Sequence, residues 1–238
     1  MKILLISDIH GNFPALQSVA AKLDADSYDH IINTGDSTVY APFANQTLDW
    51  LYKYNAVSIL GNTDIKVKKL LKGKKLKKPS KPEKRIMYTS TAETLSPAGK
   101  EYLLKLKKKK TLSISGYTIG LYHGSPDKPD EFLFDHTADS RFLELAKNTD
   151  CDIIITGHSH TPYHKKIGGV HFINPGSTGR MFDGNPQASC AVLVLKKNRV
   201  VVRHHRFSYD VEKVVRELAR QQLPAIYAEM YRTGRKLN

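Results

Sequence analysis

Residues 3–10 read ILLISDIH and join a buried-strand pattern to two polar side chains suited to metal binding. The run of four apolar residues is typical of a strand that is covered on both faces. Asp8 and His10 follow directly, and in an extended loop two residues at this spacing point to the same side. The segment therefore predicts a layered α/β fold with a functional loop after its first strand.

The pattern of a short apolar strand followed by a polar loop repeats in the next fifty or so residues. The expected elements are strands at residues 30–33 and 56–60 and helices through residues 16–23 and 44–54. Right-handed connections between parallel strands bring the loops to one edge of a sheet. We therefore expect Asp8, Asp36 and Asn62 to converge although they lie far apart in the sequence.

The second half of the chain carries a further series of expected strands, again with polar loops behind them. Strands are expected at residues 111–115, 117–122, 152–156, 163–167, 188–195 and 199–207, and helices at 139–147, 211–221 and 225–231. His123 follows the second of these strands, and His158 and His160 follow the third. Alternation alone allows one doubly wound sheet that continues the first series.

Between the two series, residues 63–110 are expected to form a basic helical excursion over the core, broken at Pro79 and Pro82 and restarted by Ser96 and Pro97 as a cap and first turn. The formal net charge is +14, and much of it lies in residues 66–85, KVKKLLKGKKLKKPSKPEKR, and residues 105–110, KLKKKK. Such runs bind acidic partners, including nucleic acid and nucleotides, by displacing counterions from phosphates. They are equally typical of a solvated segment, and no aromatic residue in 66–85 offers a surface for base stacking.

Five short segments rich in Asp, Asn, His and Gly each begin just after an expected strand. They are Asp8-Ile9-His10, Gly35-Asp36, Gly61-Asn62-Thr63-Asp64, His123-Gly124 and Gly157-His158-Ser159-His160. Carboxylate and amide oxygens suit hard divalent cations and imidazole suits first-row metals, so the mixed set favours Mn, Fe or Zn over calcium. Any one segment is typical of a helix cap or a turn. All five together indicate a metal site.

The order and content of these segments resemble the calcineurin-like metallophosphoesterase family, and in particular its small phosphodiesterase-like branch. Residues 173–177, INPGS, are similar to the same branch. The resemblance covers the chain in outline. It implies a single domain over residues 1–238, built as an α/β two-sheet β-sandwich flanked by helices, with which the expected strands are compatible.

The resemblance also implies a site for two divalent metal ions, with Mn as the expected choice and Fe, Zn or Ni as alternatives. It assigns Asp8, His10 and His160 to one ion, Asn62, His123 and His158 to the other, and Asp36 to both. A hydroxide between the ions would attack the phosphorus, so the protein needs no base of its own. Asp36, Asn62 and His123 are expected to take part in this catalysis. The expected reaction is hydrolysis of phosphodiesters, and also of phosphomonoesters, in a small molecule or a nucleotide.

Two residues beside Asn62 qualify this expectation. Many family members have His directly after the Gly-Asn pair, where this chain has Thr63, which cannot act as a general acid at neutral pH. The loss of an acid costs roughly two to four orders of magnitude on a poor leaving group, which favours diesters over alkyl monoesters. Asp64 is expected to orient a ligand histidine or, alternatively, to favour the N-terminus of the following helix.

Two other functions fit the same sequence. One is a binding scaffold that keeps the fold with weak or no catalysis, although all seven ligand positions carry residues able to coordinate. The other is a nuclease that binds nucleic acid through residues 66–85, for which affinity would fall steeply with salt. A homodimer is compatible with the sequence, which does not specify one.

The composition predicts a cytoplasmic protein without a membrane span, because no apolar run is long enough to cross a bilayer. Cys151 and Cys190 are widely spaced, and we expect both to be buried and free. Four polar residues in or near the motif loops could line the pocket, although capping or surface positions are expected for them: Asn12, Ser125, His136 and Arg180.

Overall fold

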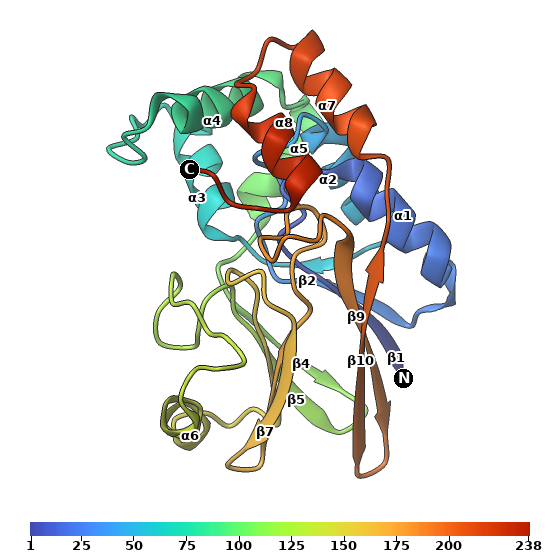
Figure 1. The fold of residues 1–238 in the computed structure, drawn as a ribbon. Coiled ribbons are helices and arrows are strands. Elements are labelled where there is room, and N and C mark those ends of the chain that lie inside the picture. Colours follow the sequence, from blue (N-terminus) through green and yellow to red (C-terminus); the bar gives the residue numbers. More distant parts are fainter.

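The computed structural model describes residues 1–238 and contains two five-stranded sheets (Figure 1). In spatial order, the first sheet consists of β10 (Arg199–Phe207), β9 (Ala188–Lys196), β1 (Lys2–Ile6), β2 (His30–Asn33) and β3 (Val57–Ser58). The second consists of β4 (Lys110–Ile114), β5 (Tyr117–Leu121), β6 (Ile153–Ile155), β8 (Val170–Asn174) and β7 (Tyr163–Ile167). Both sheets contain parallel and antiparallel pairs.

The first strand lies at the centre of its sheet, parallel to β2 and antiparallel to β9. Because successive strand residues point to opposite faces, its apolar run serves two cores. Ile3 and Leu5 belong to the core between the sheets, whereas Leu4 and Ile6 belong to the core under the helices. Each of these fully buried side chains contributes about 1.5–3 kcal/mol through removal of apolar surface from water.

The core between the sheets is built from aliphatic side chains of both layers. Its fully buried members include Ile32 from the first sheet and Ile119, Ile153 and Ile173 from the second. Isoleucine suits this position because its branched side chain packs well on a pleated surface. The two layers are therefore held face to face by one apolar core.

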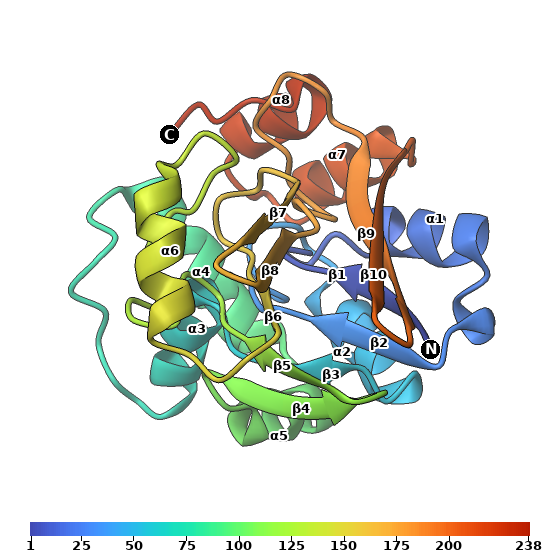
Figure 2. The same cartoon turned by 90° about the horizontal axis from the view of Figure 1, so that it is seen from below.

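Helices cover the outer faces of both sheets. The first sheet is covered by α1 (Phe13–Leu23), α2 (Ala44–Lys53), α3 (Asn62–Leu71), α4 (Pro82–Thr94), α5 (Pro97–Lys105), α7 (Val211–Arg220) and α8 (Ile226–Thr233). The second is covered by α6 (Asp139–Lys147), whose Phe142 and Leu145 pack on Phe172 of β8. Figure 2 shows α1 and α6 on opposite sides of the strands.

The two-sheet sandwich implied by the family resemblance is confirmed, and the alternative of one doubly wound sheet is wrong. Strands β4 to β8 form a sheet of their own, while β9 and β10 return to the first sheet beside β1. The pairing Lys2↔Val194 joins residues from nearly opposite ends of the chain. Local sequence patterns do not specify a pairing of such long range.

Two local features differ from expectation. The strand β8 was not expected, and β3 is only two residues long and pairs with β2 alone. The basic excursion is broken where its prolines predicted: α3 ends at Leu71, residues 72–81 are irregular, α4 begins at Pro82, and α5 begins at Pro97 after its cap Ser96. None of the helices has both the length and the apolar character needed to cross a membrane.

Candidate metal centre

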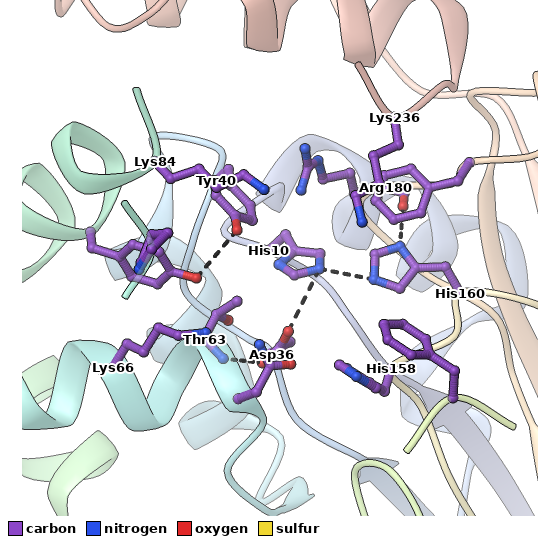
Figure 3. A pocket seen from close by; sticks show the side chains of 15 residues that line it. His10, Asp36, Tyr40, Thr63, Lys66, Lys84, His158, His160, Arg180 and Lys236 are labelled. Carbon is purple, nitrogen blue, oxygen red and sulfur yellow. Dashed lines mark hydrogen bonds and ion pairs between the residues drawn. The ribbon is translucent and has the colours of Figure 1, made fainter. Parts of the chain in front are cut away.

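The candidate ligands converge where the loops of both sheets meet. Four of them, His10, Asp36, His158 and His160, are labelled in Figure 3 around one pocket. In the first sheet, Asp8 and His10 follow β1, Asp36 follows β2, and Asn62 follows β3 at the start of α3. In the second sheet, His123 follows β5, and His158 and His160 follow β6. Five of these seven side chains are buried, and Asn62 and His158 are partly exposed. Both sheets therefore contribute to a single cluster.

Five of the seven candidate ligands have a left-handed backbone. They are Asp8, His10, Asp36, His158 and His160, with φ between 50° and 64°. Residues other than glycine rarely adopt this region, and doing so costs about 1–3 kcal/mol each. Such strain persists where the surrounding structure enforces it, and it is concentrated at functional sites.

Glycines beside the ligands let the loops approach closely. A Cβ on Gly61 would lie 2.1 Å from Oδ1 of Asp36, and one on Gly157 would lie 2.7 Å from Oδ2 of Asp8. Neither distance is compatible with a side chain. The two glycines are thus required by the positions of the two carboxylates.

Three of the histidines are held in one tautomer by backbone carbonyls. The Nδ1 atoms of His10, His123 and His160 lie within hydrogen-bonding distance of the carbonyl oxygens of Val39, Thr34 and Arg180, respectively. A carbonyl only accepts, so each Nδ1–H donates and each Nε2 faces the cluster, where it can bind a metal in its unprotonated form. This is the arrangement that orients imidazole as a metal ligand.

Two overlapping groups of side chains could each hold an ion. Asp8, His10 and His160 form one group, and Asp8, Asp36 and His123 form the other, with ligand atoms within 4.8 Å of one another. His160 Nε2 lies 3.2 Å from Asp8 Oδ1, and Asp36 Oδ2 lies 3.5 Å from His123 Nε2. Asp8 belongs to both groups, and the same Asp36 oxygen is also 3.9 Å from His10 Nε2, so both carboxylates lie near the ligands of each group.

The amide of Asn62 faces the same point. One of its terminal atoms lies 3.0 Å from His123 Nε2, 2.9 Å from His158 Nδ1 and 3.3 Å from Asp36 Oδ2. If this atom is the oxygen, it is satisfied by a metal ion or by a proton on His123; if it is the NH₂ group, it donates to these neighbours, and the oxygen accepts from Lys66 Nζ at 3.3 Å. The first orientation is the one that metal binding would select.

Two buried atoms of the cluster have no hydrogen-bond partner, Oδ1 of Asp8 and Nε2 of His158. Buried polar atoms are nearly always paired in native proteins, and unpaired ones indicate an ion or water. Both are lone-pair donors of the kind that bind first-row metals. The residues present therefore fit a divalent metal.

Burial sets the protonation of the ligand histidines. It lowers the pKa of His10 to about 3 and, together with the charge of His123, lowers the pKa of His158 to about 4, so both rings are neutral at pH 7. Burial also acts to lower the pKa of His123, but the carboxylate of Asp36 outweighs it and raises that pKa to about 9. Without metal, a proton is therefore held beside Asp36, where a cation would replace it.

Asp64 and Thr63 organise the loops around Asp36 and Asn62. The buried Asp64 carboxylate accepts from the backbone N–H groups of Ser37, Thr38 and Gly61. Asp64 contacts no ligand histidine, and the alternative is confirmed: it lies in the first turn of α3, where it accepts from the Gly61 N–H, and it joins this helix to the loop after β2. The Thr63 N–H donates to Asp36 Oδ1 at 2.7 Å.

The walls of the site come from residues that carry no sequence motif. A cleft of about 200 Å³ lies over the cluster, and its other lining residues include Tyr40, Lys66, Lys84, Tyr88, Phe132, Arg180, Phe182 and Lys236. They belong to several separate segments, so no spacing in the sequence indicates them. Lys66 and Lys84 are parts of the basic run, whereas the lysines between them at 72–78 are exposed.

Of the four residues expected at caps or on the surface, only Arg180 lies in the cleft. Asn12 caps α1 through Ala15 N–H, and the exposed His136 bonds to Asp135. Ser125 donates to Glu131, away from the cleft. Arg180, in contrast, is buried in the wall of the cleft, so the surface position expected for it is wrong.

The sandwich fold and the Asp/His/Asn cluster between its layers are those of a metallophosphoesterase. A model of the calcineurin-like phosphoesterase superfamily domain matches residues 1–198, and the chain belongs to this superfamily. The family resemblance noted in the sequence is thereby confirmed.

Several known proteins are similar over most of the chain. The protein MJ0912 of Methanocaldococcus jannaschii is 26% identical over 250 residues, covering 98% of each chain. A metallophosphoesterase from Sphaerobacter thermophilus has a TM-score of 0.81 at 24% identity, covering 98% of this chain and 99% of its own. An archaeal phosphodiesterase has a TM-score of 0.51 at 15% identity, covering 87% of this chain and all of its own. These structural likenesses show a shared fold.

Proposed function

We propose that this protein is a hydrolase with two divalent metal ions, most favourably Mn, that cleaves phosphodiester bonds and, less efficiently, phosphomonoesters. The whole chain, residues 1–238, would act as one catalytic domain. The observation that carries the proposal is the convergence of seven Asp, His and Asn side chains, from loops of both sheets, on one point. Membership of the phosphoesterase superfamily supports it.

Two divalent ions would lower the pKa of a bound water, so that hydroxide is available as the nucleophile, and would neutralise charge on the phosphoryl group. The chain's own contribution is to fix the ligands before any ion arrives. Backbone carbonyls hold the rings of His10, His123 and His160, and the Thr63 N–H holds Asp36. Asp36, near the ligands of both groups, is proposed to serve both ions, with Asn62 and His158 completing the second site.

The proposed preference for diesters comes from Thr63. Its side chain lines the cleft directly after Asn62, and its hydroxyl is buried without a partner. A threonine hydroxyl cannot give up a proton at neutral pH, so it cannot protonate a leaving alkoxide. Substrates whose leaving group departs without a proton are therefore favoured.

The experiment that tests this function starts with metal-stripped protein. Hydrolysis of bis-p-nitrophenyl phosphate and p-nitrophenyl phosphate is measured after addition of Mn, in the wild type, Asp36→Ala and His123→Ala. We expect Mn to restore activity in the wild type, and both variants to lose at least about a hundredfold, since even residues behind the ligands are worth 10- to 100-fold. Asp49→Ala, at an exposed position on α2, is the matched control.

The competing function is a binding scaffold of the same fold. Metal bound at the cluster without hydrolysis in the presence of Mn, Zn, Fe, Ni or Co would contradict the enzyme and favour the scaffold. The nuclease function, the homodimer and the cytoplasmic location stay predictions from the sequence alone.

A further inference from the structure

Arg180 is a buried cation with no anion beside it. Its side chain lines the cleft near His160 and is only 6% exposed (Figure 3). Nη2 donates to Met230 Sδ, a weak acceptor, at 2.9 Å, and Nε is buried with no partner. The rings of Tyr40 and Phe182 lie 4.2 and 5.1 Å from the guanidinium carbon. A ring stacks on the flat face of a guanidinium and does not accept hydrogen bonds from the N–H groups at its edge.

A guanidinium in this position requires a partner that the chain does not supply. Burying an unpaired charge is costly, and native proteins normally pair buried arginines with an anion. The oxygens of a phosphate match the planar N–H groups of arginine in a two-point contact. Because Arg180 borders the cleft, its missing partner can enter from there.

Two lysines extend the positive charge along the same wall. Nζ of Lys236 and the guanidinium of Arg180 both lie over the Phe182 ring, at 5.8 and 5.1 Å. Burial and then the charges of Lys236 and Arg180 lower the pKa of Lys84, so the three cations are close enough to repel one another. In Figure 3 they lie along one edge of the pocket, whereas Lys66 lies at another edge beside Thr63.

The number of charges in the cleft exceeds what one phosphodiester needs. Four cations line it, Lys66, Lys84, Arg180 and Lys236, against a single carboxylate, Asp36. Lys66 Nζ lies 3.3 Å from the amide of Asn62 and is therefore placed beside the phosphate under attack. A diester carries one negative charge, which leaves the other three cations without a partner.

We propose that Arg180, Lys84 and Lys236 form a subsite for a second phosphate group of the substrate, separate from the phosphate that is hydrolysed. The proposal rests on the proposed function and narrows its substrate class to compounds that carry at least two phosphate groups. It also gives a role to the end of the basic run. Lys84 lies there, and it would bind a phosphate of the substrate within the cleft.

The first test is binding of radiolabelled inorganic phosphate to metal-free protein by equilibrium dialysis. We expect the wild type to bind, and Arg180→Gln to bind at least about tenfold more weakly, as expected for loss of a charged hydrogen bond. Arg203→Gln, at an exposed position on β10, should bind like the wild type. Absence of binding by the wild type, or equal binding by Arg180→Gln, overturns the proposal.

A double variant covers the case in which Arg180→Gln does not fold, as judged by its far-ultraviolet circular dichroism. Lys84→Gln with Lys236→Gln changes only partly buried or exposed positions and should weaken phosphate binding to a similar extent. Unchanged binding in this folded variant would remove both lysines from the subsite and contradict the proposal.

The number of bound phosphates separates a second subsite from a single one. Protein loaded with Mn should bind two phosphates per chain, one at the metals and one at Arg180. Binding of a single phosphate that both Mn and Arg180 strengthen would place Arg180 at the hydrolysed group and overturn the proposal. Because phosphate binding without metal requires no catalysis, its failure is distinct from a failure to hydrolyse the nitrophenyl substrates.

Discussion

Gly61 has an ordinary extended backbone, with φ −88° and ψ −179°, so only the space around it excludes a side chain. A Cβ there would lie 2.1 Å from Asp36 Oδ1 and 2.3 Å from the Asp36 backbone nitrogen. Gly61→Ala must therefore displace Asp36. Because displacements near 1 Å cost on the order of a hundredfold in rate, we expect Mn-dependent hydrolysis of bis-p-nitrophenyl phosphate to fall by about that factor.

Gly99→Ala is the matched control for this substitution. Gly99 lies in α5, away from the cleft, and its new Cβ would be 3.2 Å from the nearest atom. Because α5 contributes no residue to the cleft, the variant should keep its activity, and its unfolding temperature shows whether the fold tolerates the added methyl group. Full activity in Gly61→Ala would contradict the tight placement of Asp36.

Thr63 leads to a prediction about leaving groups. Without a proton donor at this position, the rate should depend strongly on how readily the leaving oxygen accepts negative charge. We expect diphenyl phosphate to react slower than bis-p-nitrophenyl phosphate by about a hundredfold or more, in line with the contribution of a general acid. Similar rates for the two diesters would show that another side chain donates the proton.

At the scale of residues, the candidate ligands could be predicted from the sequence, whereas most residues that line the walls of the cleft could not. Asp8, Asp36 and His123 each follow an apolar strand, a pattern that is visible in a single sequence. Arg180 and Lys84 reach the cleft only because distant segments pack together. The position of Arg180 near a motif loop allowed a place in the pocket, although a cap or surface position was expected, and the context of Lys84 does not differ from that of a surface lysine. Asp64 shows an intermediate case: its place at the start of a helix was one of two expectations, but its contacts with Ser37 and Thr38 of the loop after β2 were not predicted.

At the scale of elements, the hairpin of β7 and β8 predicts a pH dependence of stability. His164 Nε2 and His171 Nδ1 lie 2.9 Å apart across it, and burial, then the charge of His164, lowers the pKa of His171 to about 4. The unfolded chain therefore takes up a proton before the folded one as the pH falls. The stability that the neutral ring provides is present above about pH 6.5 and is lost as the pH falls towards 4.

His171→Gln removes this titrating group. Between pH 7.5 and 4.5, we expect the urea midpoint of unfolding to fall less in this variant than in the wild type, both measured without metal. His136→Gln, at an exposed position, should follow the wild type. Parallel curves for His171→Gln and the wild type would show that the histidine pair has no part in acid destabilisation.

Most elements could be predicted because their apolar patterns are local. The pattern fails where an element depends on its partners. Strand β8 pairs with β6 and β7, and the signal that was missed is the turn at Gly168 and Gly169, both with positive φ, which joins it to β7. Strand β3 shows the opposite error, because a longer strand was expected there. Its apolar run lies at the edge of the sheet, and only two of its residues pair with β2.

At the scale of the whole molecule, a bound metal would join the two sheets. Asp8 and Asp36 come from the first sheet and His123 and His160 from the second, so an ion that binds them stabilises the folded arrangement of both layers. At an ion concentration 100 times its dissociation constant, this stabilisation is about 2.7 kcal/mol. For a chain of this size the unfolding temperature should rise by roughly 5–10 °C.

This prediction is checked by thermal unfolding of metal-stripped protein with and without Mn. Asp36→Asn should lose most of the rise, whereas Asp49→Asn, at an exposed position, should keep it. An equal rise in all three proteins would mean that Mn acts elsewhere on the molecule. The order of strands across both sheets, on which this argument depends, could not be read from the sequence, because it is fixed by contacts between distant segments.

The left-handed backbone of the ligand loops also bears on how such a protein changes over generations. Replacing His10 or His160 by glycine would remove a ligand and, at the same time, relieve a conformational cost of about 1–3 kcal/mol. The same exchange would remove a buried ring and leave the carbonyl of Val39 or Arg180 without its donor, which costs at least as much as the strain that is relieved. The fold itself, and not only the chemistry, therefore favours histidine at both positions. Descendants that had lost their activity would still be expected to keep these rings.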